Sequence, residues 1–76
     1  MSAMEQIRRT RKVPAKRGMR VTVDGKPGTI RSASRGYINV QFDGDRHTMP
    51  AHPTWRVTYL DKDGYVLLDT ENRTGA

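Results

Sequence analysis

The chain has 76 residues, and its 14 Lys and Arg residues outnumber 8 Asp and Glu residues to give a formal charge of +6. This length allows one small domain and excludes a large enzyme with a buried pocket. The absence of cysteine excludes disulfides and thiolate chemistry, and it favours a reducing cytoplasm as the location. No apolar run approaches the roughly 20 residues of a membrane span, so we expect no membrane partner.

The positive charge is concentrated near the N-terminus. Residues 1–20 hold seven basic residues and one acidic residue, whereas residues 21–76 hold seven of each. A run of like charges repels itself and is a ready ligand for polyanions. We therefore expect a basic arm at residues 1–17, a neutral body at residues 18–69 and a polar tail at residues 70–76.

The arm has the pattern of a short helix. Ser2 and Glu5 have the spacing of a capping box, and Pro14 ends any helix that begins there. Because an isolated helix of about ten residues is marginal in water, the arm is expected to be either disordered or helical only when it is packed or bound.

The body alternates apolar and polar residues with the period of a β-strand. Turn signals separate the segments: Asp24-Gly25, Pro27-Gly28 as the centre of a type II turn, and Arg35-Gly36. Pro50 is expected to end a strand. The pattern predicts five or six short strands at residues 19–23, 29–33, 37–42, 46–49, 55–59 and 65–68. The predicted fold class is therefore all-β, a small antiparallel barrel or sandwich.

The predicted core consists of about a dozen apolar side chains, and at roughly 1.5–3 kcal/mol each their burial leaves little surplus stability. They are Val21, Val23, Ile30, Ile38, Val40, Phe42, Trp55, Val57, Tyr59, Leu60, Val66 and Leu68. Such a core leaves no internal volume for a large ligand.

Residues 18–44, GMRVTVDGKPGTIRSASRGYINVQFDG, alternate hydrophobic residues and carry Gly28 as their eleventh residue. This segment resembles the KOW motif of SH3-like barrels, which occur in ribosomal proteins and transcription-elongation factors. The resemblance covers about a third of the chain and implies an SH3-like antiparallel barrel of about five strands that binds nucleic acid. The chain departs from the motif where the usual basic loop is reduced to Lys26, and where Asp43 and Asp45 make a neighbouring loop negative.

The leading functional hypothesis is a non-enzymatic protein that binds DNA or RNA through phosphates, in a salt-dependent and largely sequence-independent way. The candidate contacts are the seven cations of residues 1–20 and three residues around the second turn of the body. They are Arg8, Arg9, Arg11, Lys12, Lys16, Arg17 and Arg20, together with Arg31, Arg35 and Tyr37.

The alternative hypothesis is a protein-interaction module that docks through His52, Trp55 and Tyr59. The segment HPTWRVTYLD at residues 52–61 is similar to a segment of small phage and actinobacterial proteins, so this module would be of the phage-encoded kind. A separate candidate is an aromatic patch of Tyr37, Trp55, Tyr59 and Tyr65, whose rings can stack unpaired bases or cage a methylated cation. The favoured interpretation of these tyrosines is structural, with the ring buried at a strand end and the hydroxyl in water. The structural interpretation is favoured for Trp55, as a filler of the core or its rim.

Catalytic and metal-binding patterns are nearly absent. Asp43, Asp45 and His47 alternate in the sequence, but they are interpreted as a turn followed by an exposed strand start. No catalytic residue, metal site or cofactor is predicted.

Overall fold

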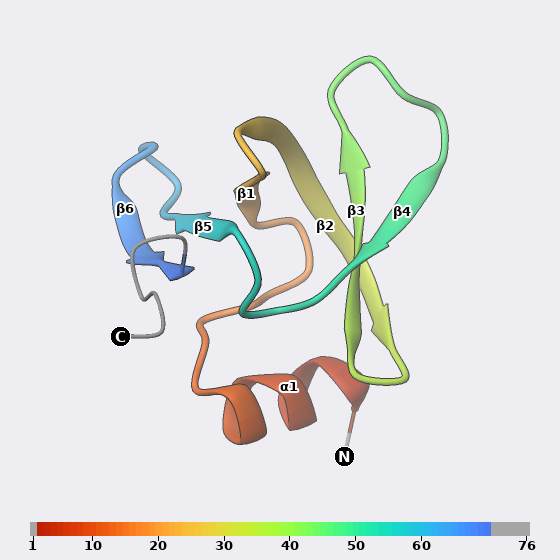
Figure 1. Cartoon of the computed structure of the whole chain (residues 1–76), viewed down its shortest axis with the longest axis vertical. Coiled ribbons are helices and arrows are strands. Elements are labelled where there is room, and N and C mark those ends of the chain that lie inside the picture. Colours follow the sequence, from red (N-terminus) through yellow and green to blue (C-terminus); the bar gives the residue numbers. More distant parts are fainter. Residues whose placement is uncertain (1, 71–76) are drawn as a thin grey trace.

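The computed structural model describes residues 2–70, which form one helix and six strands (Figure 1). In chain order these are α1 (Ala3–Arg11), β1 (Arg20–Val23), β2 (Lys26–Ser34), β3 (Tyr37–Phe42), β4 (Thr48–Ala51), β5 (Val57–Leu60) and β6 (Val66–Asp69). The helix lies below the β2–β3 hairpin in Figure 1.

All strand pairs are antiparallel, and the sheet has the order β4-β3-β2-β1-β5-β6. The predicted all-β antiparallel architecture is therefore confirmed at this level, with one short helix added. Within residues 2–70, however, β4 and β6 remain the two edges of the sheet and do not pair with each other, so the sheet is not closed into a barrel.

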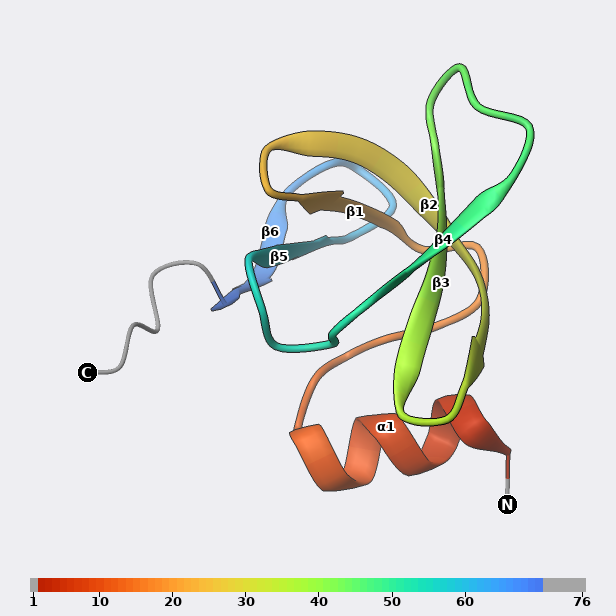
Figure 2. The same cartoon turned by 45° about the vertical axis from the view of Figure 1, so that its right-hand side comes forward.

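Strand β2 connects the two halves of this sheet. Its first residues pair with β1, and almost its whole length pairs with β3 across an irregularity between Ile30 and Ser32. Figure 2 shows β2 curving, so that β3 and β4 run steeply across the direction of β1 and β5. This curvature gives the open sheet a concave side on which its apolar residues can gather.

Two tight hairpins fix the register of the first three strands. Val23 pairs with Lys26, so Asp24 and Gly25 alone form the first loop, with φ angles of 52° and 81°. Two positive φ values are the signature of a type I′ hairpin turn, and an Asp-Gly pair suits it. The second hairpin, at residues 35–36, repeats this geometry.

The type II turn predicted at Pro27 and Gly28 is wrong, because both residues lie inside β2. Gly28 serves another purpose there. A Cβ atom at this position would lie 2.7 Å from Val40 Cγ1 and 2.9 Å from the carbonyl oxygen of Gln41. The glycine therefore allows a close approach of β2 to β3 rather than a turn.

Two predicted strands are displaced along the chain. The segment predicted at residues 46–49 is Thr48–Ala51, and it continues through Pro50, which an edge strand tolerates because a missing N–H costs nothing there. The segment predicted at residues 55–59 is Val57–Leu60, preceded by Arg56 in the left-handed region (φ 56°). Trp55 thus lies outside the strand and is 68% exposed, so its assignment to the core is wrong.

The buried apolar residues come from the sheet and from the arm. The sheet contributes Val21, Ile30, Ile38, Val40, Val57 and Tyr59, and the arm contributes Ile7, Val13 and Ala15. The Ser2 hydroxyl caps α1 by accepting a hydrogen bond from the backbone N–H of Glu5 at 3.1 Å. Residues 2–17 are therefore helical over α1, and their buried side chains belong to the same core as the body.

The C-terminal end of the described chain is hydrogen-bonded to β5. The buried Thr70 hydroxyl accepts a bond from the Val57 N–H at 2.8 Å and donates one to the Val57 carbonyl at 2.7 Å. The rest of the predicted polar tail, residues 71–76, lies outside the described residues. Over residues 2–70, no helix is both long enough and apolar enough to cross a membrane.

Candidate functional site

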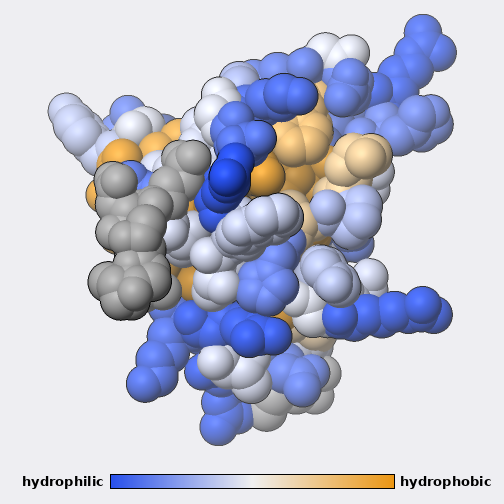
Figure 3. All heavy atoms as spheres, in the orientation of Figure 1, coloured by the Kyte–Doolittle hydropathy of each residue, from blue (hydrophilic) through white to orange (hydrophobic). Residues whose placement is uncertain are grey.

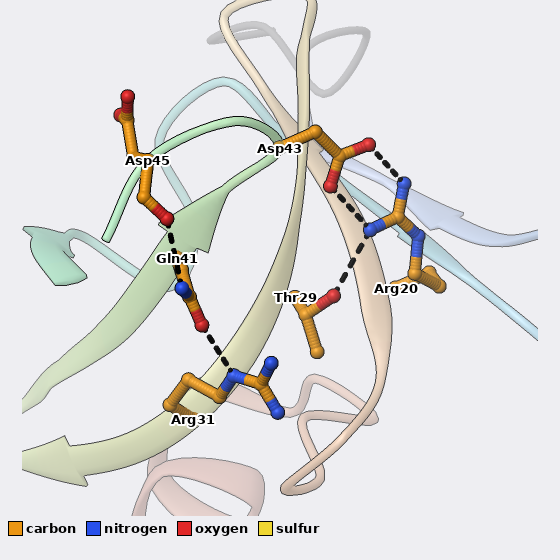
Figure 4. A network of polar contacts seen from close by, with 6 residues as sticks. All are labelled: Arg20, Thr29, Arg31, Gln41, Asp43 and Asp45. Atoms are coloured by element: carbon orange, nitrogen blue, oxygen red, sulfur yellow. Dashed lines mark hydrogen bonds and ion pairs between the residues drawn. The ribbon is translucent and has the colours of Figure 1, made fainter. Parts of the chain in front are cut away.

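Two of the predicted phosphate ligands are engaged in contacts that shape the fold. Arg8 Nη1 on α1 donates a hydrogen bond to the Ala15 carbonyl at 2.9 Å, which ties the helix to the loop after it. Arg20 donates to both carboxylate oxygens of Asp43 at 2.7 Å, and also to the Thr29 hydroxyl at 2.9 Å (Figure 4).

The Arg20–Asp43 pair changes the electrostatics of its neighbourhood. The hydrogen bond from Arg20 lowers the pKa of Asp43, and the same bond raises the pKa of Arg20. The carboxylate therefore neutralises this guanidinium locally, which makes Arg20 a weaker phosphate ligand than the sequence suggests.

Arg31 is held by one edge of its guanidinium. Its Nε donates to Gln41 Oε1 at 2.8 Å, and Gln41 Nε2 donates in turn to the Asp45 carbonyl at 2.8 Å. Figure 4 shows the two terminal nitrogens of Arg31 pointing away from Gln41. The side chain is thus oriented while keeping donors for a ligand.

Arg31 meets cations of the arm in a hollow of about 460 Å³, which we call the first basic hollow. Its charged lining residues are Arg8 from α1, Arg17 from the following loop and Arg31 from β2. Among the described residues that line it, none is acidic. The arm and β2, which are separate in the sequence, therefore present positive charge to one concave surface.

A second basic hollow, of about 420 Å³, lies where α1 meets the β2–β3 hairpin. Arg11 near the end of the helix and Arg35 in the hairpin turn line it, together with uncharged residues such as Gln6 and Thr10. No acidic side chain is found among its described lining residues. The hairpin therefore contributes a cation to the same hollow as the arm.

The remaining cations of the arm are also exposed. Arg9 lies on α1, and Lys12 caps the helix in the left-handed conformation with a φ of 55°. Lys16 lies beside a different hollow, whose lining also includes Asp61 and Asp63. Figure 3 shows long hydrophilic side chains projecting around the lower part of the molecule, over α1.

The aromatic candidates separate into exposed and buried residues. Tyr37 is 47% exposed, and its ring meets the ring of His52 edge to face, with 6.2 Å between centroids. Trp55 is exposed, with the Arg56 guanidinium 5.7 Å from its ring centroid. Tyr59, by contrast, is fully buried, so it is removed from the interaction surface predicted for it.

The burial of Tyr59 has a local structural role. Its hydroxyl donates a 2.6 Å hydrogen bond to the Pro53 carbonyl, and burial raises the pKa of this tyrosine. The side chain of His52 accepts a bond from the Thr54 N–H at 3.2 Å through Nδ1. Both bonds fix the loop that carries Trp55.

An open groove of about 600 Å³ runs between these aromatic residues, and we call it the aromatic groove. Its lining residues are Val23, Tyr37, Pro50, Ala51, His52, Thr54 and Trp55. The sequence pointed to Tyr37, His52 and Trp55, but not to the other four. No sequence signal could have placed Val23 there, because the curvature of the sheet brings β1 to the groove.

The alternating acidic residues and histidine at 43–47 do not assemble into a metal site. Over residues 2–70, no three His, Asp or Glu side chains lie close enough together to hold a metal ion. Asp43 is instead bonded to Arg20.

No protein-family model matches the chain, and comparisons with curated proteins and with solved structures give no significant match. The function must therefore be inferred from the chain's own geometry.

Proposed function

We propose that this protein binds nucleic acid without catalysing a reaction, and that α1 and the adjoining β2–β3 hairpin form the binding surface. The observation that carries the proposal is the convergence of cations in the two basic hollows. Arg8, Arg17 and Arg31 line one of them, and Arg11 and Arg35 line the other. Phosphate oxygens are the ligands that such arginine groups favour, because a guanidinium offers several donors in one plane.

The surface suits a polyanion better than a single small anion. Two hollows with separate cations, and further cations at Arg9 and Lys12 on the same helix, offer contacts to successive phosphates of one strand. Such contacts position a nucleic acid without reading its sequence. The proposed ligands therefore include both DNA and RNA. We place this binding in the cytoplasm, and it requires no cofactor.

We also propose that the fold is of the SH3-like type, with residues 18–44 as a KOW motif. The antiparallel order of β1, β2 and β3 is consistent with this assignment. The position of Gly28 supports it as well, since a Cβ atom there would come within 2.9 Å of the Gln41 backbone. Unlike a closed barrel, this sheet leaves β4 and β6 as edges over the described residues.

The test compares two triple variants of the full chain that remove the same charge from different places. The site variant carries Arg11→Gln, Arg17→Gln and Arg35→Gln, and the control variant carries Lys26→Gln, Arg46→Gln and Lys62→Gln. All six side chains are exposed, so both variants should fold. A truncated arm is a poor test because it would remove buried Ile7 and Val13.

Affinity for DNA and RNA is measured by fluorescence anisotropy over a range of salt concentrations. If about five cations contact phosphates of a duplex, the log–log slope should be about −4 to −5 for the unmodified chain. Loss of three contacts should make the slope of the site variant shallower by about 2–3. The slope of the control variant should stay close to that of the unmodified chain. No binding by the unmodified chain at about 50 mM salt, or equal losses in both variants, would contradict the proposal.

A further inference from the structure

The aromatic groove lies next to the basic surface but is built differently. Its seven lining residues, at 23, 37, 50–52, 54 and 55, include no Asp, Glu, Lys or Arg. Two of its rings are substantially exposed, Trp55 at 68% and Tyr37 at 47%. Exposed rings beside an uncharged hollow offer flat apolar faces to a ligand. The Arg56 guanidinium lies over the Trp55 ring, 5.7 Å from its centroid, and the His52 ring meets Tyr37 edge to face, so each ring is covered in part.

We propose that the aromatic groove binds unpaired nucleobases, so that the protein prefers single-stranded nucleic acid to a duplex. This inference rests on the proposed function and names its substrate more closely. Bases stack on aromatic side chains regardless of sequence, because every base has a π-face. A duplex offers no such face along its length, since its bases are already stacked.

The charges around the groove favour a base attached to a phosphate backbone. The Arg56 guanidinium lies 5.7 Å from the Trp55 ring centroid, where a cationic ligand would be repelled. Within residues 2–70, no carboxylate lines the groove, which disfavours a methylated-cation cage, since caged cations gain from nearby negative charge. A neutral base with flanking phosphates is complementary to this arrangement, although Asp24 partly offsets Arg56 through a 3.1 Å ion pair.

The groove is continuous with the phosphate-binding surface along the chain. Arg35 and Gly36 line the second basic hollow, and the next residue, Tyr37, lines the aromatic groove. A strand whose phosphates lie on the hollow can therefore turn its bases toward Tyr37 and Trp55. Consecutive residues of one tight hairpin hold the phosphate contact and the first base contact together.

The rim of the groove is also held in place before any ligand binds. Tyr59 anchors the Pro53 carbonyl at 2.6 Å, and the Thr54 N–H donates to His52 Nδ1 at 3.2 Å. The edge-to-face contact of His52 with Tyr37 links this rim to β3. Such pre-organisation lowers the entropy that is lost when a base binds.

The chain's single tryptophan makes the proposal directly testable. The intact protein is titrated with three ligands: a short single-stranded oligonucleotide, an abasic strand of equal length and a duplex of the same sequence. Stacking on Trp55 should quench its fluorescence with the base-bearing single strand and not with the abasic strand. The base-bearing strand should bind about 5- to 150-fold more tightly than the abasic strand, the range for one base–aromatic stack.

Variants separate the stacking from the phosphate contacts. Trp55→Ala should reduce single-strand affinity to near that of the abasic strand, whereas Trp55→Phe retains most of it because the ring remains. Tyr65→Ala is the matched control, since Tyr65 is an equally exposed aromatic residue (72%) that does not line the groove. Circular dichroism confirms that each variant is folded.

The outcomes distinguish this inference from the proposed function. Equal affinity for the base-bearing and abasic strands, or unchanged affinity in Trp55→Ala, overturns the groove proposal while phosphate binding stands. No binding to any of the three ligands overturns both. Occupation of the groove by an extended peptide, with Trp55→Ala losing the peptide but not the oligonucleotide, also overturns it and supports protein docking instead.

Discussion

The two ends of the described chain use their apolar residues in opposite ways. In the arm, Ile7, Val13 and Ala15 are buried, although the segment is short and strongly basic. In β6 and the turn before it, Tyr65, Val66 and Leu67 are all more than half exposed, although the segment is apolar. Figure 3 shows hydrophobic atoms at the surface on the left, over β6.

This difference shows that burial follows from the neighbour a segment finds, not from its own hydrophobicity. The arm lies across the β2–β3 hairpin, whereas β6 is an edge strand with one partner, β5. Ile7 therefore packs on a sheet face, and Val66 has no covering layer within residues 2–70. The C-terminal end is held instead by polar contacts, the two hydrogen bonds between the Thr70 hydroxyl and the backbone of Val57.

The largest expected effect comes from truncating one apolar side chain at each end. Ile7→Ala should lower the free energy of unfolding by about 2–5 kcal/mol, because it leaves a cavity in the shared core. Val66→Ala should change it by no more than about 0.5 kcal/mol, because that side chain is 59% exposed. Urea unfolding followed by circular dichroism measures both, and a similar small effect at the two sites would show that the arm is not part of the core.

A smaller effect on the free energy of unfolding is expected from the hydrogen bonds of Thr70 at the C-terminal end. Thr70→Val removes the hydroxyl and leaves the buried N–H and carbonyl of Val57 without this partner, which should cost about 1–3 kcal/mol of stability. Thr70→Ser keeps the hydroxyl and is the control. If the valine variant unfolds at the same urea concentration as the serine variant, the two hydrogen bonds contribute nothing measurable.

The smallest expected effect is a pH dependence of the free energy of unfolding, and it arises from Tyr59 on β5. Burial raises the pKa of Tyr59 in the folded chain, whereas an unfolded tyrosine ionises near pH 10. Above about pH 10 the unfolded state therefore binds fewer protons than the folded state, and stability should fall as the pH rises. Below that pH the contribution is fully present.

Chemical unfolding at a series of alkaline pH values checks this dependence. Tyr59→Phe should be less stable at neutral pH, because it loses the bond to Pro53, but its stability should decline less above about pH 10. The same decline in both proteins would assign the effect to other groups.

Much of the local structure was predictable from the sequence. The two Gly-containing hairpin turns at residues 24–25 and 35–36, the cap at Ser2 and the alternation in β3 all depend on residues within a few positions of one another. The predictions failed where residues distant in the sequence determine the local structure. A glycine is needed at position 28 because Val40 and Gln41 lie against it, and Pro50 is tolerated within a strand because β4 is an edge of the sheet.

The candidate site was predicted in its composition but not in its assembly. The sequence identified the basic residues of the arm, and Arg31 and Arg35 beyond it. It could not tell that Arg20 is paired with Asp43, or that Trp55 is exposed although it was assigned to the core with Tyr59. Tyr59 is buried as the core prediction had it, which excludes it from the interaction surface also predicted for it. Alternation alone does not separate these two aromatic residues, because Arg56 in the left-handed conformation interrupts the strand between them.

By itself, the sequence determined the charge of the arm, the alternation within the strands and the turns at residues 24–25 and 35–36, because each of these is a property of neighbouring residues. Only the tertiary structure decided which side chains are buried, which cations share a hollow and which rings line a groove. These depend on the curvature of β2 and on α1 packing across the hairpin, which bring residues 8, 17 and 31 to one hollow and residues 23, 37 and 55 to one groove.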